Sequence, residues 1–358
     1  MLKFHPLRLV EKRQLTDKSV ELTFDIQSKS EFSDFKPGAY VNVQAPLKGE
    51  LVRRSYSLSS LPNSRSISIG VKCVEGGLMS SFLTHEIHVD QTLEVSKPEG
   101  NFGLRIDDSL AIHHVFFGAG SGITPLMSMI QHVLSFRTSD SVTLFFGNRS
   151  SSEIMYKEEL ARLSASNPQF TYHNILSDKS LAEPILSGRI DFGKTWALLG
   201  QFVQDEMHKE FYICGPGEMI LSVRNALKDL GHADDQIHLE YFKAPDADGT
   251  PVLEVKASTP QNDFVGVSKV EAELDDESFE FEVPTNGNSV LDTALDEGLD
   301  PPFSCKGGVC TSCKAKIIEG TVKMDSNFAL TDSELADGFI LTCQSHPTSE
   351  KLKITWDF

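Results

Sequence analysis

The sequence is short of positive charge and has no long hydrophobic stretch. Its 358 residues include 33 Lys and Arg against 51 Asp and Glu, a formal net charge of −18. Nucleic acids and anionic membranes attract proteins with an excess of Lys and Arg, so neither is expected as a partner. No apolar run approaches the ~18 residues of a membrane span, and residues 1–13 have no signal-peptide core. We therefore expect a cytoplasmic protein without membrane insertion.

The negative charge is unevenly distributed along the chain. Residues 251–358 contain 20 acidic and 8 basic side chains, a net charge of −12. About a third of the chain therefore carries two thirds of the charge, which predicts a distinct acidic C-terminal domain. The total length predicts two or three domains at about 100–200 residues per domain.

Hydrophobic patterns predict two different architectures before that domain. Residues 1–106 contain short alternating runs separated by turns, as at 39–44 and 66–72, which predict an antiparallel β-barrel. Residues 107–242 alternate apolar strands with helical stretches, which predicts an α/β domain with a parallel sheet. The expected strands are 114–117, 142–146 and 211–213, and the expected helices are 125–134, 152–163 and 218–230.

The remainder of the chain has the composition of a linker followed by a small domain. Residues 243–262 are rich in Pro, Asp and Ser and are expected to link the domains. Within residues 263–358 we expect a hairpin over 270–283 and a helix over 290–297 that Ser289 caps.

Only six cysteines are present, and four of them form a pattern. Cys305, Cys310 and Cys313 have the spacing C-x4-C-x2-C, and Cys343 follows 30 residues later. This is the ligand spacing of plant-type [2Fe–2S] clusters, and Gly307–Gly308 would let backbone N–H groups turn toward the sulfurs. Structural zinc or free thiols are the alternatives, although zinc ligands usually come in C-x2-C pairs. The segment resembles plant-type ferredoxins, whose fold is α+β (β-grasp).

Two segments of the expected barrel resemble the flavin-binding residues of the ferredoxin–NADP reductase family. In the R-x-Y-S motif the resemblance implies that Arg54 binds the flavin pyrophosphate, Tyr56 stacks on the isoalloxazine and Ser57 lies near flavin N5. It also implies that Gly77 and Ser80 belong to a phosphate-binding loop. The similarity favours FAD over the FMN of phthalate-type relatives. An Arg and a Tyr on a strand can equally be ordinary surface and core residues.

Two further segments resemble the nicotinamide-binding residues of the same family. A glycine-rich turn with Gly120, Gly122 and Thr124 follows a predicted strand and opens a helix, although its spacing differs from the classical Rossmann motif. The resemblance places the threonine near the nicotinamide. Cys214–Gly215 matches the family's C-G-P motif at the nicotinamide–flavin contact, so Ser57 and Cys214 are the candidate catalytic residues. A buried strand-end thiol is the alternative for Cys214, and Cys73 is interpreted as structural.

Two further residues are candidates for cofactor binding. Arg149 follows a predicted strand and can pair with the 2′-phosphate of NADPH, whereas NADH enzymes tend to carry an acid there. The alternative is a solvated loop arginine. Phe242 precedes the linker and either shields the flavin or closes the domain core.

In this order the domains resemble the reductase components of multicomponent oxygenases, most strongly the reductase subunits of phenylacetyl-CoA epoxidases. The resemblance implies an oxidoreductase that passes electrons from NADPH through FAD and a [2Fe–2S] cluster to an oxygenase or epoxidase component. Steroid hydroxylases and fatty-acid desaturases are alternative acceptors. A flavohaemoprotein would need a globin-length segment before the barrel, and an iron–sulfur sensor would need a basic binding module. We see neither in the sequence.

Overall fold

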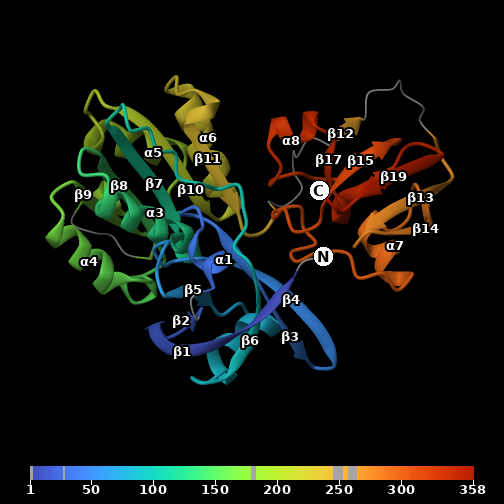
Figure 1. Cartoon of the computed structure of the whole chain (residues 1–358). Helices are drawn as coiled ribbons and strands as arrows, with labels where there is room; N and C mark the ends of the chain where they lie inside the picture. Colours follow the sequence, from blue (N-terminus) through green and yellow to red (C-terminus); the bar gives the residue numbers. More distant parts are fainter. Residues whose placement is uncertain (1–2, 27–28, 179–182, 245–252, 257–263) are drawn as a thin grey trace. The chain divides into compact units, whose positions relative to one another are not determined.

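The computed structural model describes residues 3–26, 29–178, 183–244, 253–256 and 264–358. The chain divides into two compact units, one formed mainly by residues 5–245 and the other mainly by residues 246–358. Most of the predicted linker, residues 243–262, lies outside the described residues. Figure 1 shows the elements of each unit.

An antiparallel sheet of six strands forms the first part of the larger unit. The strand order is β4-β3-β6-β1-β2-β5, and Leu58, just after β4, forms a bridge with Ile69 of β5 that curls the sheet toward closure. Alternate side chains face inward, as in β2, where Val20, Leu22 and Phe24 are fully buried. The elements are β1 Phe4–Thr16, β2 Ser19–Asp25, α1 Ser30–Ser33, β3 Tyr40–Leu47, β4 Glu50–Ser57, β5 Ser66–Lys72, α2 Leu78–Ser81, a π-helical turn Phe82–Glu86 and β6 Thr92–Ser96.

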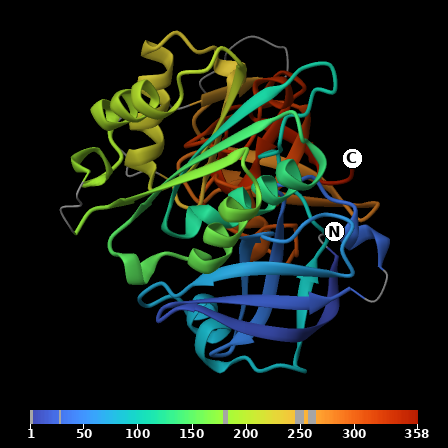
Figure 2. The same ribbon diagram turned by 90° about the vertical axis from the view of Figure 1, so that its left-hand side faces the viewer.

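A parallel sheet of five strands forms the second part of the larger unit. Its order is β11-β10-β7-β8-β9. Strands β8 and β9 are added on one side of β7, and β10 and β11 on the other, so the strand order reverses between β7 and β10. Helices α3 and α4 follow one face of the sheet and α5 and α6 the other, as right-handed crossovers require (Figure 2). The elements are β7 Ile112–Ala119, α3 Ile123–Phe136, β8 Ser141–Asn148, α4 Lys157–Ser166, β9 Phe170–Leu176, α5 Phe192–Phe202, β10 His208–Gly215, α6 Gly217–Asp229 and β11 Ile237–Tyr241.

The predicted helix over residues 152–163 begins later than expected. Ser151–Glu153 form a 3₁₀ turn, and Tyr156 adopts a left-handed conformation, with φ 57°, immediately before α4 begins at Lys157. A left-handed residue cannot continue an α-helix, so the apolar residues Ile154 and Met155 lie in a loop, where both are buried.

The smaller unit has a mixed sheet with the order β14-β13-β19-β15-β17 and a second sheet with the order β12-β16-β18. The expected hairpin is confirmed, because β13 and β14 are antiparallel and Val270 lies opposite Phe281. Asp275 and Asp276 at its turn have φ 55° and 63°, as a two-residue hairpin turn requires. The elements are β12 Leu253–Lys256, β13 Val267–Leu274, β14 Glu277–Pro284, α7 Val290–Asp296, β15 Lys314–Glu319, β16 Thr321–Met324, α8 Asp332–Ala336, β17 Phe339–Leu341, β18 Ser345–Pro347 and β19 Lys351–Thr355.

Helix α7 begins where the sequence predicts. The side chain of Ser289 accepts a hydrogen bond from the backbone N–H of Asp292, so it caps the helix. Val290, Leu291 and Ala294 are fully buried and join the core that supports the cysteine-rich loop. That loop, residues 305–313, lies between α7 and β15.

Candidate redox site

The carboxyl ends of β7 and β10 lie side by side at the point where the strand order of the parallel sheet reverses. Cys214 of β10 lies opposite Gly118 of β7. Gly120 has φ 54°, and a Cβ atom on Gly122 would lie 2.1 Å from the carbonyl oxygen of Cys214. The glycine turn can therefore approach the end of β10 only without side chains. In open α/β sheets this is the edge at which ligands bind.

The turn leads into a helix whose N-terminus has no side-chain cap. Helix α3 has 14 residues, and its N-cap is Gly122. The hydroxyl of Thr124 donates to the carbonyl of Ser121 at 3.0 Å. Uncapped N–H groups and the helix dipole favour an anion at this end of a helix. The predicted residues Gly120, Gly122, Thr124 and Gly215 therefore lie together, around a turn that suits a dinucleotide pyrophosphate.

A hydroxyl, a thiol and a carboxyl group converge beside that turn. The hydroxyl of Ser57, at the end of β4, lies 3.5 Å from Oε2 of Glu240, and Sγ of Cys214 lies 4.0 Å from the same oxygen. Glu240 is opposite Cys214 in the parallel pairing of β11 with β10. The sequence pattern did not indicate a role for Glu240. Its signal was its position on the last strand of the sheet, two residues before Phe242.

Burial shifts the acidity of both titratable members of this triad of Ser57, Cys214 and Glu240. Burial raises the pKa of the Glu240 carboxyl group to about 8, against a smaller opposing effect of the hydrogen bond from Ser57. Burial, and then the charge of Glu240, raises the pKa of the Cys214 thiol. Both groups are therefore protonated at neutral pH. Titratable groups with shifted pKa values are typical of sites that carry out proton transfer.

Of the predicted flavin residues, Arg54, Tyr56 and Ser57 lie on β4, Gly77 is the N-cap of α2, and Ser80 lies within α2. Arg54 is exposed and Tyr56 is half-buried against the barrel core, and the two share one face of β4. A Cβ on Gly77 would lie 2.6 Å from Oγ of Ser80. That hydroxyl accepts from Val74 N and donates to Gly77 O, so Ser80 holds the loop's shape.

Arg149, expected to select the nucleotide, lies after β8, and Phe242, expected to shield the flavin or to close the domain core, lies after β11. Arg149 is exposed just beyond β8 and forms no ion pair with another described residue. Its neighbour Asn148 is buried, and neither polar atom of its amide has a partner among the described residues. The ring of Phe242 is 43% exposed, so it does not close the domain core.

The four predicted cluster ligands lie in the smaller unit, and none forms a disulfide. Sγ of Cys310 lies 3.0 Å from Sγ of Cys305, which also accepts from the backbone N–H of Gly307 at 3.3 Å. The hydrogen bond from Cys310, with those from backbone N–H groups, lowers the pKa of Cys305. A hydrogen bond from Cys313 likewise lowers the pKa of Cys343.

The backbone of this loop differs in one detail from the expected glycine pair. The left-handed residues are Lys306, with φ 52°, and Gly308, with φ 70°, and Gly307 instead contributes its N–H to Cys305. A Cβ on Gly308 would lie 2.8 Å from Oγ of Ser326. Backbone N–H groups that converge on thiols fit an anionic thiolate-bound cluster.

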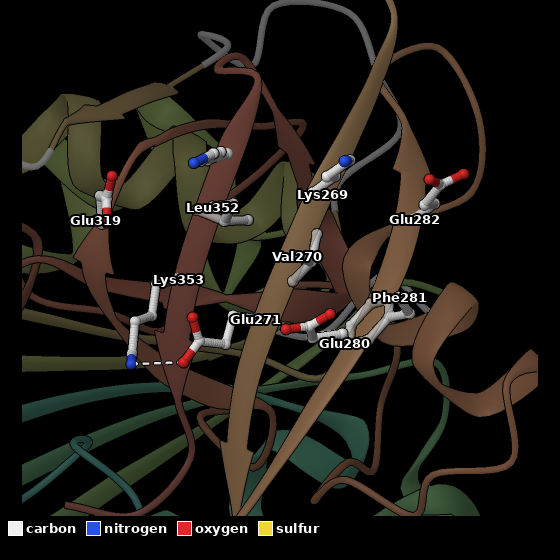
Figure 3. Close-up of a pocket in the computed structure, with 10 residues that line it drawn as sticks. Lys269, Val270, Glu271, Glu280, Phe281, Glu282, Glu319, Leu352 and Lys353 are labelled. Carbon is white, nitrogen blue, oxygen red and sulfur yellow. Dashed lines mark hydrogen bonds and ion pairs between the residues drawn. The ribbon is translucent and has the colours of Figure 1, made fainter.

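One pocket lies outside these sites. A pocket of about 520 Å³ is lined by charged side chains on the outer face of the sheet of β14, β13, β19 and β15 (Figure 3). Lys353 and Glu271 in this pocket pair with each other at 2.6 Å.

Cys73 is half-buried, and its sulfur lies 3.7 Å from the hydroxyl of Ser81.

Three protein families match consecutive parts of the chain. An oxidoreductase FAD-binding domain matches residues 6–103, an oxidoreductase NAD-binding domain residues 116–225, and a 2Fe-2S iron-sulfur cluster binding domain residues 272–348. The chain is thus an oxidoreductase with FAD-, NAD- and [2Fe–2S]-binding domains. No helix of the described residues is long and apolar enough to cross a membrane.

Similar proteins have the same organisation. The chain is 36% identical to a subunit of the 1,2-phenylacetyl-CoA epoxidase of Escherichia coli K12, over 100% of this chain and 99% of the relative. It is 30% identical to the ferredoxin reductase component of 3-ketosteroid-9-alpha-monooxygenase from Mycolicibacterium smegmatis, over 98% and 96%. The solved structure of phthalate dioxygenase reductase has the same fold, with a TM-score of 0.59 and 22% identity over 98% of each chain. The chain belongs to the family of flavin- and [2Fe–2S]-containing reductases that includes these oxygenase components.

Proposed function

We propose that this reductase takes electrons from NADPH and delivers them singly to an oxygenase component, which we infer to be a phenylacetyl-CoA epoxidase. The observation that carries the reductase assignment is the convergence of Ser57, Cys214 and Glu240 at the carboxyl edge of the parallel sheet. The choice of acceptor is supported by the relative in Escherichia coli, which is a phenylacetyl-CoA epoxidase subunit.

In this proposal each predicted residue keeps one task. Arg54 pairs with the FAD pyrophosphate, Tyr56 lies against the isoalloxazine, and the loop of Gly77 and Ser80 presents its backbone N–H groups. Gly120, Gly122 and Gly215 admit the NADPH pyrophosphate to the N-terminus of α3, and Thr124 borders the nicotinamide. Phe242, whose ring is exposed, covers the flavin until the nicotinamide arrives.

The triad of Ser57, Cys214 and Glu240 is proposed to relay the proton that is left over when both electrons of the hydride have passed on to the cluster. Bound FAD supplies a two-electron acceptor for hydride and a one-electron donor to the cluster. With a pKa of about 8, the carboxyl group of Glu240 is mostly neutral at pH 7, so it adds no negative charge where a hydride must arrive. The Ser57 hydroxyl, 3.5 Å from Oε2 of Glu240, would connect that carboxyl group to a bound flavin.

Arg149 supports the preference for NADPH. Its guanidinium is exposed at the end of β8 and has no ion pair among the described residues, so it is available for a 2′-phosphate.

Cys305, Cys310, Cys313 and Cys343 are proposed as the four cluster ligands. Their support is the convergence of thiols and backbone N–H groups described above. The proposed domains are residues 1–106 for FAD, 107–242 for the nucleotide and 263–358 for the cluster, joined by 243–262. A cytoplasmic location is proposed because NADPH is available there and thiols stay reduced.

The test combines cofactor analysis with a comparison of acceptors. The purified protein should release FAD and contain two iron and two sulfide per chain, and NADPH should bleach its flavin faster than NADH at equal concentration. Electron delivery should be faster to a purified phenylacetyl-CoA epoxidase than to a steroid hydroxylase or a desaturase. Equal use of NADPH and NADH would contradict the nucleotide preference, and a preference for another acceptor would replace the epoxidase.

A further inference from the structure

Gly70 of β5 lies against the part of the nucleotide domain that opens α3. A Cβ atom on Gly70 would lie 2.5 Å from the Tyr156 hydroxyl and 2.6 Å from Cγ2 of Thr124. Real Cβ atoms do not approach heavy atoms that closely, so the bare backbone of Gly70 is what lets the barrel and these two side chains meet. Gly70 has no positive φ, so the requirement for glycine is one of space.

Tyr156 is held firmly on its own side of this contact. Its side chain is 3% exposed, and its backbone has the left-handed conformation that ordinary residues rarely adopt. Such strained positions persist only where the surrounding structure fixes them. Tyr156 ends the segment that begins at Arg149 and joins β8 to α4.

Two ion pairs fasten the same segment to the barrel on either side of Tyr156. Lys72 of β5 pairs with Glu153 at 3.2 Å. Arg13 of β1 pairs with Glu21 of β2 at 2.6 Å and with Glu159 of α4 at 3.4 Å. The segment that carries Arg149 is therefore tied to the barrel at Glu153 and at Tyr156, and α4, which follows it, is tied at Glu159.

Thr124 contacts Ser121 through its hydroxyl and Gly70 through its methyl group. Its hydroxyl donates to the carbonyl of Ser121, and its methyl group, Cγ2, is the atom that meets Gly70. A small displacement at Gly70 would therefore move the start of α3 and the residue assigned to the nicotinamide.

We propose that Gly70 and Tyr156 form a positioning contact that fixes Thr124 and the Arg149 segment relative to the flavin barrel, and so sets the approach of the nicotinamide to the flavin. This inference rests on the proposed function, in which Thr124 borders the nicotinamide. Neither Gly70 nor Tyr156 is a catalytic residue, because each acts through the groups that it holds in place. Sub-ångström errors in the placement of reacting groups are costly for reactions between two bound rings.

The test adds one methyl group at the contact and then removes the atoms that it would meet. Gly70→Ala should slow flavin reduction by NADPH at least tenfold, weaken the long-wavelength absorbance of stacked nicotinamide and flavin, and weaken binding of NADP⁺. The triple variant Gly70→Ala with Thr124→Ser and Tyr156→Phe lacks both atoms that the new Cβ would meet, Cγ2 of Thr124 and the hydroxyl of Tyr156, so it should recover a large part of the absorbance and the rate. Gly200→Ala is the control, because nothing lies within 4 Å of its Cβ position.

The outcomes separate this inference from the proposed function. If NADPH does not reduce the flavin of the unmodified protein, the proposed function fails. If it does, and Gly70→Ala matches Gly200→Ala in absorbance and rate, the positioning contact is refuted. If Gly70→Ala does not fold, Tyr156→Leu decides: it should lose the long-wavelength absorbance while dithionite still reduces the flavin at the normal rate, and unchanged absorbance would overturn the inference.

Discussion

The two units of the molecule surround their reactive groups with different kinds of chemistry. In the larger unit, Ser57, Cys214 and Glu240 keep exchangeable protons at neutral pH. In the smaller unit, the partners of the cysteine sulfurs include the backbone N–H of Gly307 and the amide of Gln344, which donate hydrogen bonds and do not titrate. A hydride is equivalent to a proton and two electrons, whereas an electron that leaves a cluster carries no proton. The difference supports the proposal that the larger unit handles protons and the smaller unit releases electrons.

The most severe test of this contrast is to remove one sulfur. Cys310→Ser should abolish the cluster and reduce electron delivery to the oxygenase component by more than a hundredfold, because no other carrier connects flavin and acceptor. Reduction of ferricyanide by NADPH should persist, measured by stopped-flow absorbance. Cys73→Ser is the matched control and should retain both activities. Loss of ferricyanide reduction in Cys310→Ser would mean that the units do not divide the work in this way.

The next effect concerns the proton of Glu240. The rate of flavin reduction by NADPH should fall as pH rises through about 8, because ionised Glu240 opposes the arriving hydride. Glu240→Gln cannot ionise, so its rate of flavin reduction should stay close to that of the unmodified protein at pH 7 and be flat across this range, whereas electron delivery, which leaves a proton behind, should slow roughly tenfold. A pH profile for Glu240→Gln that still bends near 8 would assign the titration to another group.

The same pKa predicts a change in stability. The folded protein holds the proton of Glu240 more tightly than the unfolded chain does, since its pKa is raised from 4.5 to about 8. The contribution of this proton to stability is therefore complete below about pH 4.5 and is lost as pH rises toward 8. Thermal unfolding should show Glu240→Gln gaining stability relative to the unmodified protein between pH 5 and pH 8, and parallel curves would contradict the raised pKa.

A smaller effect is expected at Arg149. Arg149→Ala should raise KM for NADPH about tenfold, the usual size for loss of one charge-assisted phosphate contact, and leave KM for NADH unchanged. Steady-state ferricyanide assays measure both values. A proportional change for NADPH and NADH would show that the side chain orders the loop and does not bind the 2′-phosphate.

The smallest effect should come from ionic strength. The acidic C-terminal region, with a net charge of −12 over residues 251–358, should steer a positively charged acceptor, so electron delivery should slow as salt increases. Reduction of the flavin by NADPH within the larger unit should respond less to salt. Asp296→Asn and Glu297→Gln at the exposed end of α7 should lower the salt dependence of electron delivery. If delivery by the unmodified protein does not depend on salt, electrostatic steering of the acceptor is refuted.

The sequence is most informative about the site where chemistry dictates the spacing of residues. Cys305, Cys310 and Cys313 must come from one loop, so their intervals are visible in the sequence. Strands β9 and β11 were not predicted because each contains several polar residues among its apolar ones, as in the Thr171, His173 and Asn174 of β9. Without β11 its pairing was unknown, and Glu240 could not be placed beside Cys214. That register, and the close contact at Gly70, depend on three-dimensional packing that no local pattern records.

The order of strands in the smaller unit bears on biosynthesis. Strand β19, at Lys351–Thr355, lies between β13 and β15, although it is the last of them to be translated. The sheet that supports the cysteines therefore stays open until those residues leave the ribosome, whereas the parallel sheet is complete once Tyr241 has emerged. We therefore expect flavin to be incorporated while translation continues, and iron and sulfide to be delivered afterwards.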